Sequence, residues 1–223
     1  MTQTNVKICG LQSVEVIKSI INFPVDFVGF VFAKSKRQVT AQAAGDMIRE
    51  LHAIRNGAEK PYTVGVFVNP TRDDLVETLR YAPLDYIQLH QQETPEFCGW
   101  VKRDLSKKVI KTISIQGEQT AQAVQELLDP YHDNADILLL DTFDLVIGGG
   151  TGKTFSWEHI PLYQEWAAQA GIPLWIAGGL DADNVGTLIA DFHPDGVDVS
   201  SSVETDGMKD LDKIKAFVER VKS

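Results

Sequence analysis

The sequence predicts an α/β protein that folds as one (β/α)8 barrel. Eight short runs of β-branched and apolar residues alternate with longer segments of helical spacing, which is typical of parallel strands joined by helical crossovers. The runs recur at roughly the ~30-residue spacing of a βαβ unit. The chain has 223 residues, and a closed barrel of eight units needs about 200–250. An open doubly wound sheet is the alternative, because strand number alone does not prove closure.

Five strands are expected in the first half of the chain, each a short apolar or β-branched run. They cover residues 6–9, 26–32, 62–68, 86–90 and 109–115. Apolar residues from Leu11 to Ile21 recur at helical spacing after the first strand, and a second helix is expected over 40–55. Asn69-Pro70-Thr71 supplies a turn and the start of the helix that follows the third strand.

Three more strands are expected in the second half, over residues 137–141, 174–177 and 197–200. Before them, Glu118-Gln119-Thr120 begins a helix that ends before Pro130, and an amphipathic helix over 211–221 closes the chain. No shift in composition, Ser/Gly-rich linker or low-complexity tract divides the sequence. We therefore expect a single domain, the (β/α)8 barrel, over residues 1–223.

Composition and charge limit the classes of function. The chain has 21 basic and 31 acidic residues, for a net charge of −10, and so acidic a surface repels the phosphate backbone of nucleic acids. No apolar run approaches the ~18–20 residues that cross a bilayer. The two cysteines, Cys9 and Cys98, are too few for a disulfide framework and fit a reducing compartment. We expect no nucleic-acid or membrane partner and a cytoplasmic location.

Small residues follow the last two expected strands. In a (β/α)8 barrel the working residues lie at the C-terminal strand ends and in the loops after them. Gly178-Gly179 and Ser200-Ser201 occupy such positions, where backbone N–H groups and a helix N-terminus favour a phosphate dianion. A site of this kind needs no lysine or arginine, so it is compatible with an acidic protein. A tight turn without ligand is the alternative interpretation.

The glycine-rich segment 148–154 resembles a nucleotide-binding loop in composition, but its spacing does not fit the Walker motif. Ile147 stands where a Walker motif has its first glycine. A loop that folds over a bound substrate fits the glycine density better, and its amides, Gly152 among them, could reach a phosphate. A surface loop without a role is the alternative.

Cys9 and Asp141 end the first and sixth strands and form a candidate acid–base pair at one barrel mouth. The two groups have opposite needs: a thiolate base needs help from a cation or a helix N-terminus, whereas an aspartic acid that donates near neutrality needs a raised pKa. The simpler alternatives are a small buried hydrophobe for Cys9 and a capping role for Asp141. Cys98, in an expected helix, is interpreted as packing.

Lys34, Lys36 and Arg37 form the densest basic cluster of the chain. A planar guanidinium can bind a substrate carboxylate through two parallel hydrogen bonds, which makes Arg37 the candidate in this cluster. A solvated loop is the alternative.

Charged and polar residues also occur inside the expected strands. Lys7 and Asp198 would lie on neighbouring strands of a closed barrel, and we expect them in contact because an unpaired interior charge is costly. Gln88 and His90 share one strand face and are expected to form a polar core pair, with substrate contact as the lesser alternative. No set of His, Cys, Asp and Glu has convincing metal-ligand spacing, so no metal is expected.

Taken in order, the strand-end motifs closely resemble the phosphoribosylanthranilate isomerase family of tryptophan biosynthesis. The matching motifs are Lys7-Ile8-Cys9-Gly10-Leu11, Gly29-Phe30-Val31-Phe32 with Lys34-Ser35-Lys36-Arg37-Gln38-Val39, Val64-Gly65-Val66-Phe67-Val68-Asn69, Gln88-Leu89-His90, Leu139-Leu140-Asp141-Thr142, Gly149-Gly150-Thr151-Gly152-Lys153-Thr154-Phe155, Ala177-Gly178-Gly179-Leu180 and Val197-Asp198-Val199-Ser200-Ser201. Each motif alone is weak, but their order and their positions at strand ends make the combination specific. The resemblance extends almost end to end.

The resemblance implies an isomerase that needs no cofactor. Its reaction would be the Amadori rearrangement of N-(5-phosphoribosyl)anthranilate, a small phosphosugar, to 1-(2-carboxyphenylamino)-1-deoxyribulose 5-phosphate. By this analogy Asp141 is the general acid that protonates the furanose ring oxygen, Cys9 is the general base at C2′, and Arg37 binds the anthranilate carboxylate. The phosphate would be held by amides around Gly152, Gly178, Gly179, Ser200 and Ser201. A monomer and a homodimer both remain open.

Two positions depart from the family pattern. Ser202 stands where the family usually has glycine, and a φ above zero there would strain the serine by about 1 kcal/mol. Gln91 stands where glycine commonly follows Gln-Leu-His.

Two other enzymes compete with this interpretation. The related aminoaldose isomerase of histidine biosynthesis resembles a chemistry based on a pair of aspartates, which Cys9 contradicts. Indole-glycerol-phosphate synthase relies on Lys and Glu groups that are not evident in this sequence. A noncatalytic barrel that senses a phosphosugar is the alternative of another class.

Overall fold

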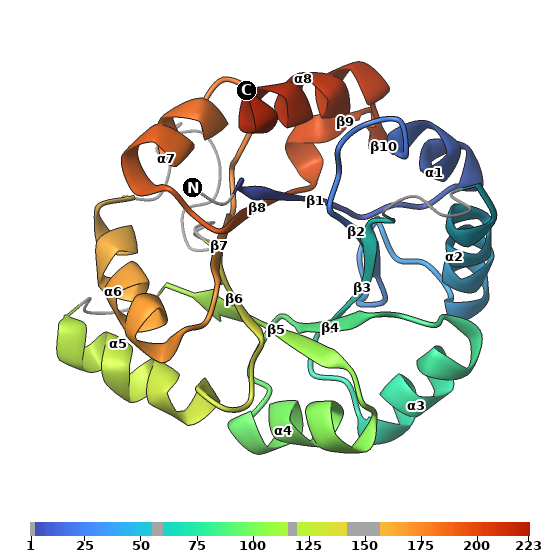
Figure 1. The fold of residues 1–223 in the computed structure, drawn as a ribbon. Coiled ribbons are helices and arrows are strands. Elements are labelled where there is room, and N and C mark those ends of the chain that lie inside the picture. The colour runs from blue at the N-terminus through green and yellow to red at the C-terminus, as the bar shows by residue number, and fades with distance from the viewer. Residues whose placement is uncertain (1–2, 55–59, 116–119, 142–156) are drawn as a thin grey trace.

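Eight parallel strands close into a barrel, with β8 paired to β1 (Figure 1). The computed structural model describes residues 3–54, 60–115, 120–141 and 157–223. The strands are β1 (Asn5–Cys9), β2 (Phe27–Val31), β3 (Tyr62–Phe67), β4 (Tyr86–Leu89), β5 (Lys108–Ser114), β6 (Ile137–Asp141), β7 (Leu174–Ala177) and β8 (Gly196–Val199). The predicted (β/α)8, or TIM, barrel is therefore confirmed, and the open-sheet alternative is wrong.

The helices surround the barrel in chain order (Figure 1). They are α1 (Val14–Ile20), α2 (Ala41–Ile54), α3 (Arg72–Tyr81), α4 (Pro95–Asp104), α5 (Ala121–Leu128), α6 (Ile160–Ala170), α7 (Val185–Phe192) and α8 (Leu211–Lys222). Two expected starts are confirmed, because the hydroxyls of Thr71 and Thr120 accept hydrogen bonds from Asp74 N and Ala123 N at the first turns of α3 and α5. None of the helices in the described ranges is long and apolar enough to cross a membrane.

Two apolar layers hold the barrel together. The larger lies between the outer face of the strands and the helices. The smaller fills the barrel interior and consists of Phe27, Val64, Tyr86, Ile110, Ile137, Leu139, Trp175 and Ala177. Because successive strand residues point to opposite faces, each strand from β2 to β7 contributes to both layers. The barrel is therefore a packed core rather than a pore, and a ligand has room only at its ends.

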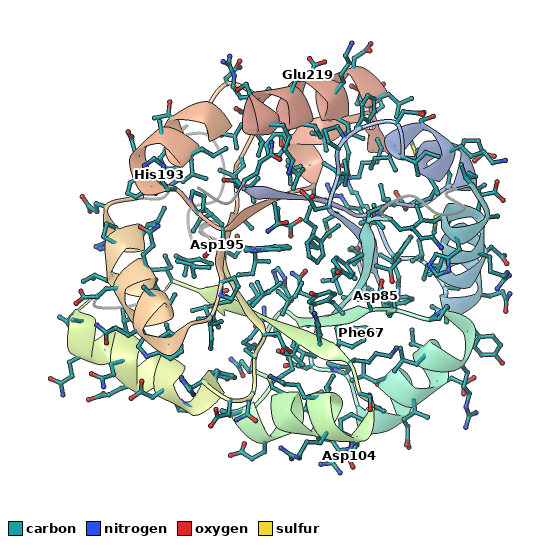
Figure 2. All side chains as sticks on the ribbon, viewed as in Figure 1. Phe67, Asp85, Asp104, His193, Asp195 and Glu219 are labelled. Atoms are coloured by element: carbon teal, nitrogen blue, oxygen red, sulfur yellow. The ribbon has the colours of Figure 1, made fainter. Side chains whose placement is uncertain are left out.

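Aspartates bind neighbouring strands together at their N-terminal ends in a repeated pattern. Each lies directly before an even-numbered strand and accepts a hydrogen bond from a backbone N–H of the odd-numbered strand before it. The pairs are Asp26 with Val6 N (2.7 Å), Asp85 with Thr63 N (2.8 Å), Asp136 with Val109 N (2.7 Å) and Asp195 with Leu174 N (2.8 Å). Figure 2 labels Asp85 and Asp195 near the strands, whereas Asp104 and Glu219 point outward from α4 and α8. The pattern explains why β2 begins at Phe27, since Asp26 acts from outside the strand.

A small hairpin between β8 and α8 is the main element that the sequence analysis did not predict. A short 3-10 turn over Ser201–Val203 leads into β9 (Glu204–Thr205), which pairs with β10 (Met208–Lys209). Asp206 and Gly207 form the turn with φ of 51° and 79°. An Asp-Gly pair is a strong two-residue hairpin signal, so the sequence did contain a clue. The hairpin lies at the C-terminal end of the barrel, next to the candidate site.

Candidate active site

A cavity of about 650 Å³ opens at the C-terminal ends of the strands. It is lined by every described residue predicted for the site, namely Cys9, Arg37, Asp141, Gly178, Gly179, Ser200 and Ser201. The remaining one, Gly152, and the whole segment 148–154 lie outside the described residues. The structure thus brings together groups from β1, β6, β7, β8 and the loop after β2.

A larger cavity, of about 1090 Å³, opens at the other end of the barrel among residues such as Tyr62, Tyr86 and Lys108. None of the predicted site residues that the structure describes lines it. In this fold the N-terminal face contributes to stability, whereas the active sites lie at the C-terminal face. Size is therefore a poor guide here, and the smaller cavity is the candidate active site.

A buried ion pair lies beneath this cavity, as predicted. Lys7 Nζ is 2.6 Å from Asp198 Oδ2 and 2.8 Å from Gln88 Oε1, and the Lys7 side chain is fully buried. Burial alone would lower the pKa of Lys7, but Asp198 and then Cys9 outweigh it, so the pKa is raised and Lys7 is a cation. Asp198 lines the cavity, and among the described residues its Oδ1 has no hydrogen-bond partner.

Cys9 ends β1 with its side chain buried at the base of the cavity. Its strand partner is Gly29, where an added Cβ would lie 2.9 Å from the Cys9 sulfur. Glycine at this position therefore provides the space for the thiol. Burial raises the pKa of Cys9, with Asp198 acting in the same direction, while the cations Lys7 and Lys209 oppose the rise. The two lysines act in the direction that favours a thiolate.

Asp141, the last residue of β6, faces His90 across the cavity. His90 Nε2 is 3.2 Å from Asp141 Oδ2. The other ring nitrogen, Nδ1, is 3.0 Å from Gln88 Nε2 and 3.3 Å from Thr112 Oγ1. The predicted polar pair of Gln88 and His90 is present, but its connection to Asp141 was not predicted.

Arg37 forms a two-pronged ion pair with Glu204 of the hairpin. Its Nε and Nη2 donate to Glu204 Oε1 and Oε2, each at 2.7 Å. Lys209 Nζ donates to the same Oε1 at 2.6 Å and to the backbone oxygen of Ser200 at 2.9 Å. Burial acts to raise the pKa of Glu204, but hydrogen bonds from the two cations outweigh it, and the pKa is lowered. Glu204 is therefore an ionised anchor between Arg37 and the loop after β8.

Gly10 allows Arg37 to reach this position. Its φ is +82°, in the region that favours glycine. An added Cβ would come within 2.6 Å of Arg37 Cδ and 3.2 Å of Ser200 Oγ. Both the backbone angle and the close approach therefore require glycine at the end of β1.

The loops proposed to hold phosphate follow β7 and β8. Gly178 and Gly179 both have positive φ, 92° and 65°. Ser202 is not among the described residues with positive φ. The backbone strain that a positive φ would cause at this serine therefore does not arise. Its hydroxyl donates instead to the backbone oxygen of Leu180, which joins the two loops.

The family model for N-(5'-phosphoribosyl)anthranilate isomerase matches residues 6–220. This chain belongs to the phosphoribosylanthranilate isomerase family. A curated phosphoribosylanthranilate isomerase of Brevibacillus brevis is 47% identical over 221 residues, which cover 99% of this chain and 94% of the relative. The family resemblance predicted from the strand-end motifs is confirmed.

Solved phosphoribosylanthranilate isomerases share the fold. The crystal structure of the Thermotoga maritima protein matches with a TM-score of 0.80 and 34% identity, over 98% of each chain. Another, in complex with reduced 1-(o-carboxyphenylamino)-1-deoxyribulose 5-phosphate, matches with a TM-score of 0.78 and 32% identity, again over 98% of each chain.

Glu204 and Lys209 are the site residues that sequence reasoning missed in this phosphoribosylanthranilate isomerase family member. Strands of two residues carry no periodicity, and Glu204 lies 167 residues from its partner Arg37. The Asp206-Gly207 turn was the available signal. Cys98, in contrast, is buried in α4 as expected for a packing residue, and burial raises its pKa to about 12.

Proposed function

We propose that this chain converts N-(5-phosphoribosyl)anthranilate, an aminoaldose, into 1-(2-carboxyphenylamino)-1-deoxyribulose 5-phosphate, in tryptophan biosynthesis. The observation that carries the proposal is the convergence of Cys9, Asp141 and Arg37 with two small-residue loops on one cavity. A relative's complex with a reduced form of this product supports the same ligand class. An acid, a base, a carboxylate clamp and a phosphate cradle are the four parts that the reaction needs.

The reaction begins with opening of the sugar ring. Asp141 in its protonated form donates its proton to the furanose oxygen, the C1′–O bond breaks, and the anthranilate nitrogen lone pair forms the C1′=N iminium. The ring oxygen leaves as a hydroxyl group, and Asp141 becomes a carboxylate. His90 Nε2, at 3.2 Å, is in place to donate a hydrogen bond to that carboxylate.

The iminium makes the neighbouring C2′–H acidic, and Cys9 removes this proton. The C–H electron pair forms the C1′=C2′ double bond of an enolamine, which tautomerises to the ketone. Because burial raises the pKa of Cys9, the base depends on the opposing cations Lys7 and Lys209. Lys7 and Lys209 stabilise the charge of the buried base in this step, because they are already fixed in place beside it.

Substrate binding uses the two ends of the molecule. Glu204 occupies the Nε–Nη2 edge of Arg37, so we assign the other edge of the guanidinium, formed by Nη1 and the second N–H of Nη2, to the anthranilate carboxylate. At the opposite end, amides around Gly152, Gly178, Gly179, Ser200 and Ser201 receive the phosphate.

Loss of fluorescence of freshly prepared phosphoribosylanthranilate tests the proposal. The wild type is expected to turn the substrate over, and Cys9→Ala or Asp141→Ala to lower kcat by about 10²–10⁴-fold with an unchanged unfolding midpoint. A noncatalytic sensor would show no wild-type turnover and would retain ligand binding in both variants. Unimpaired kcat in either variant would remove that residue from its role.

The setting of the enzyme is part of the proposal. Cys9 and Cys98 are free and buried, which fits a reducing compartment such as the cytoplasm. We assign catalysis to one domain over 1–223, as a monomer or homodimer that needs no metal or nucleic-acid partner.

A further inference from the structure

A chain of polar groups joins the buried ion pair to the general acid. It runs from Asp198 through Lys7 and Gln88 to His90, and from His90 to Asp141, with donor–acceptor distances of 2.6, 2.8, 3.0 and 3.2 Å. Lys7, Gln88 and Asp198 are buried, whereas His90 and Asp141 are partly exposed at the cavity. Each link has a direction that follows from which group can donate.

Lys7 fixes the orientation of the Gln88 side chain. An ammonium group has three donors and no acceptor, so the atom of Gln88 that faces it at 2.8 Å must be the carbonyl oxygen. The amide nitrogen therefore points the other way, toward His90 Nδ1 at 3.0 Å and Thr112 Oγ1 at 3.2 Å. The usual ambiguity between the two ends of a glutamine amide does not arise here.

The orientation of Gln88 in turn fixes the tautomer of His90. The amide N–H donates, so His90 Nδ1 must accept, and the Thr112 hydroxyl at 3.3 Å can donate to the same nitrogen. A neutral imidazole whose Nδ1 accepts carries its proton on Nε2. That proton lies on the nitrogen that is 3.2 Å from Asp141 Oδ2.

We propose that His90 is a positioning residue for Asp141, held as the Nε2–H tautomer by the hydrogen-bond chain that starts at Lys7. The inference rests on the proposed function, because it names the partner of the general acid. The Nε2–H group donates to Oδ2 of Asp141 and thereby places the transferable proton on Oδ1. It also fixes the plane of the carboxyl group relative to the sugar ring.

This hydrogen bond strengthens during the reaction. Asp141 is neutral before ring opening and negative after it, and hydrogen bonds to charged groups are roughly twice as strong as neutral ones. An interaction that is stronger in the transition state than in the ground state accelerates the chemical step. A neutral donor suits this role, because an imidazolium would favour the ionised carboxylate before the proton is needed.

Gln88→Glu is the sharpest perturbation, because it changes the direction of the chain while keeping the shape of the side chain. A carboxylate accepts from Lys7 and also from His90 Nδ1–H, so the ring proton should move to Nδ1. We expect kcat to fall about 10- to 100-fold, the value of one hydrogen bond to a charged group, with KM changed less than threefold. Gln169→Glu, the same charge change on the exposed face of α6, is the matched control and should retain wild-type kinetics.

A second pair of variants does not depend on the folding of Gln88→Glu. The amide nitrogen of glutamine is as many bonds from Cβ as Nε2 of histidine, whereas that of asparagine matches Nδ1. His90→Gln therefore keeps a donor toward Asp141 and His90→Asn does not. We expect His90→Gln to retain at least tenfold more kcat than His90→Asn, at equal unfolding midpoints.

The tautomer is measured directly by long-range ¹H–¹⁵N spectra of protein labelled with ¹⁵N-histidine. The chain has five histidines, and the signal that disappears in His90→Gln identifies His90. The wild type should show a protonated Nε2 and an unprotonated Nδ1, and Gln88→Glu the reverse. A proton on Nδ1 in the wild type would overturn the inference, as would equal kcat in the two His90 variants.

These results separate the two levels of the argument. If the wild type has no activity on phosphoribosylanthranilate, the proposed function fails. If Asp141→Asn is fully active, the role of Asp141 as general acid fails. In both cases the spectrum still decides the tautomer. If the wild type is active and Asp141→Asn is not, but Gln88→Glu and His90→Asn keep wild-type kcat, only the positioning role of His90 fails.

Discussion

Replacing Lys7 with methionine removes the only fully buried cation that contacts Asp198 in the described part of the chain. Methionine has similar length and no charge, so the change isolates electrostatics from packing. The perturbation leaves the Asp198 carboxylate, with a side chain 9% exposed, without the ammonium at 2.6 Å. The amide oxygen of Gln88 loses its donor at the same time.

The expected cost follows from the burial of both partners. Removing one member of a buried ion pair destabilises a protein by about 3–5 kcal/mol, because the remaining charge is desolvated and uncompensated. For a chain of this size that corresponds to a fall in Tm of about 6–20 °C. Because Lys7 opposes the rise in the pKa of Cys9, that pKa should also increase, and kcat/KM at pH 7 should fall.

Urea unfolding and the pH profile of kcat/KM measure the two effects separately. The double variant Lys7→Met/Asp198→Leu removes both charges and should recover most of the lost free energy of unfolding, since two apolar groups can replace a buried pair. It should not recover activity. A loss below about 1 kcal/mol in Lys7→Met, or full activity in the double variant, would refute this account of the pair.

Three other outcomes are expected. Because burial raises the pKa of Cys9, kcat/KM should increase with pH through neutrality and level off only above the ordinary thiol value of about 8.5; a plateau reached below pH 7 would contradict this. Gly29→Ala, which places a Cβ 2.9 Å from the Cys9 sulfur, should reduce kcat at least roughly tenfold and destabilise the fold by about 1–3 kcal/mol, as turnover and urea unfolding would show. Glu204→Gln removes the ionised anchor of Arg37, so KM should rise about tenfold with a smaller change in kcat, and an unchanged KM in steady-state assays would exclude the anchor.

Most of the fold could be predicted because the strands are buried on both faces and are therefore rich in apolar residues, with few polar interruptions such as Lys7 and Asp198. Residues 137–141 and 174–177 were predicted with the bounds that the structure shows. The start of β2 differs from the prediction by one residue, because the Asp26 side chain accepts a hydrogen bond from Val6 N and Asp26 lies outside the strand. The two-residue strands β9 and β10 could not be found from periodicity, since so short a segment has none.

The candidate site was predictable wherever its residues end a barrel strand. Cys9 and Asp141 belong to that group, and the rule that strand ends meet at one mouth brings them together. Glu204 does not, because its position depends on a hairpin that follows the barrel. The contact between His90 and Asp141 could not be predicted either. Alternation along a strand shows which face a residue points to, but not how far its side chain extends around the barrel.

The aspartates that precede the even-numbered strands have a consequence for how the chain assembles. Each binds a backbone amide only 20 to 27 residues away, so the entropy lost in closing that loop is small. The Lys7–Asp198 contact spans 191 residues and must wait for the last strand. Pairs of adjacent strands can therefore associate while the polypeptide is still being synthesised, and ring closure becomes the final step. In pulsed hydrogen exchange during refolding, the amides of Thr63 and Val109 should then become protected before those that join β1 to β8.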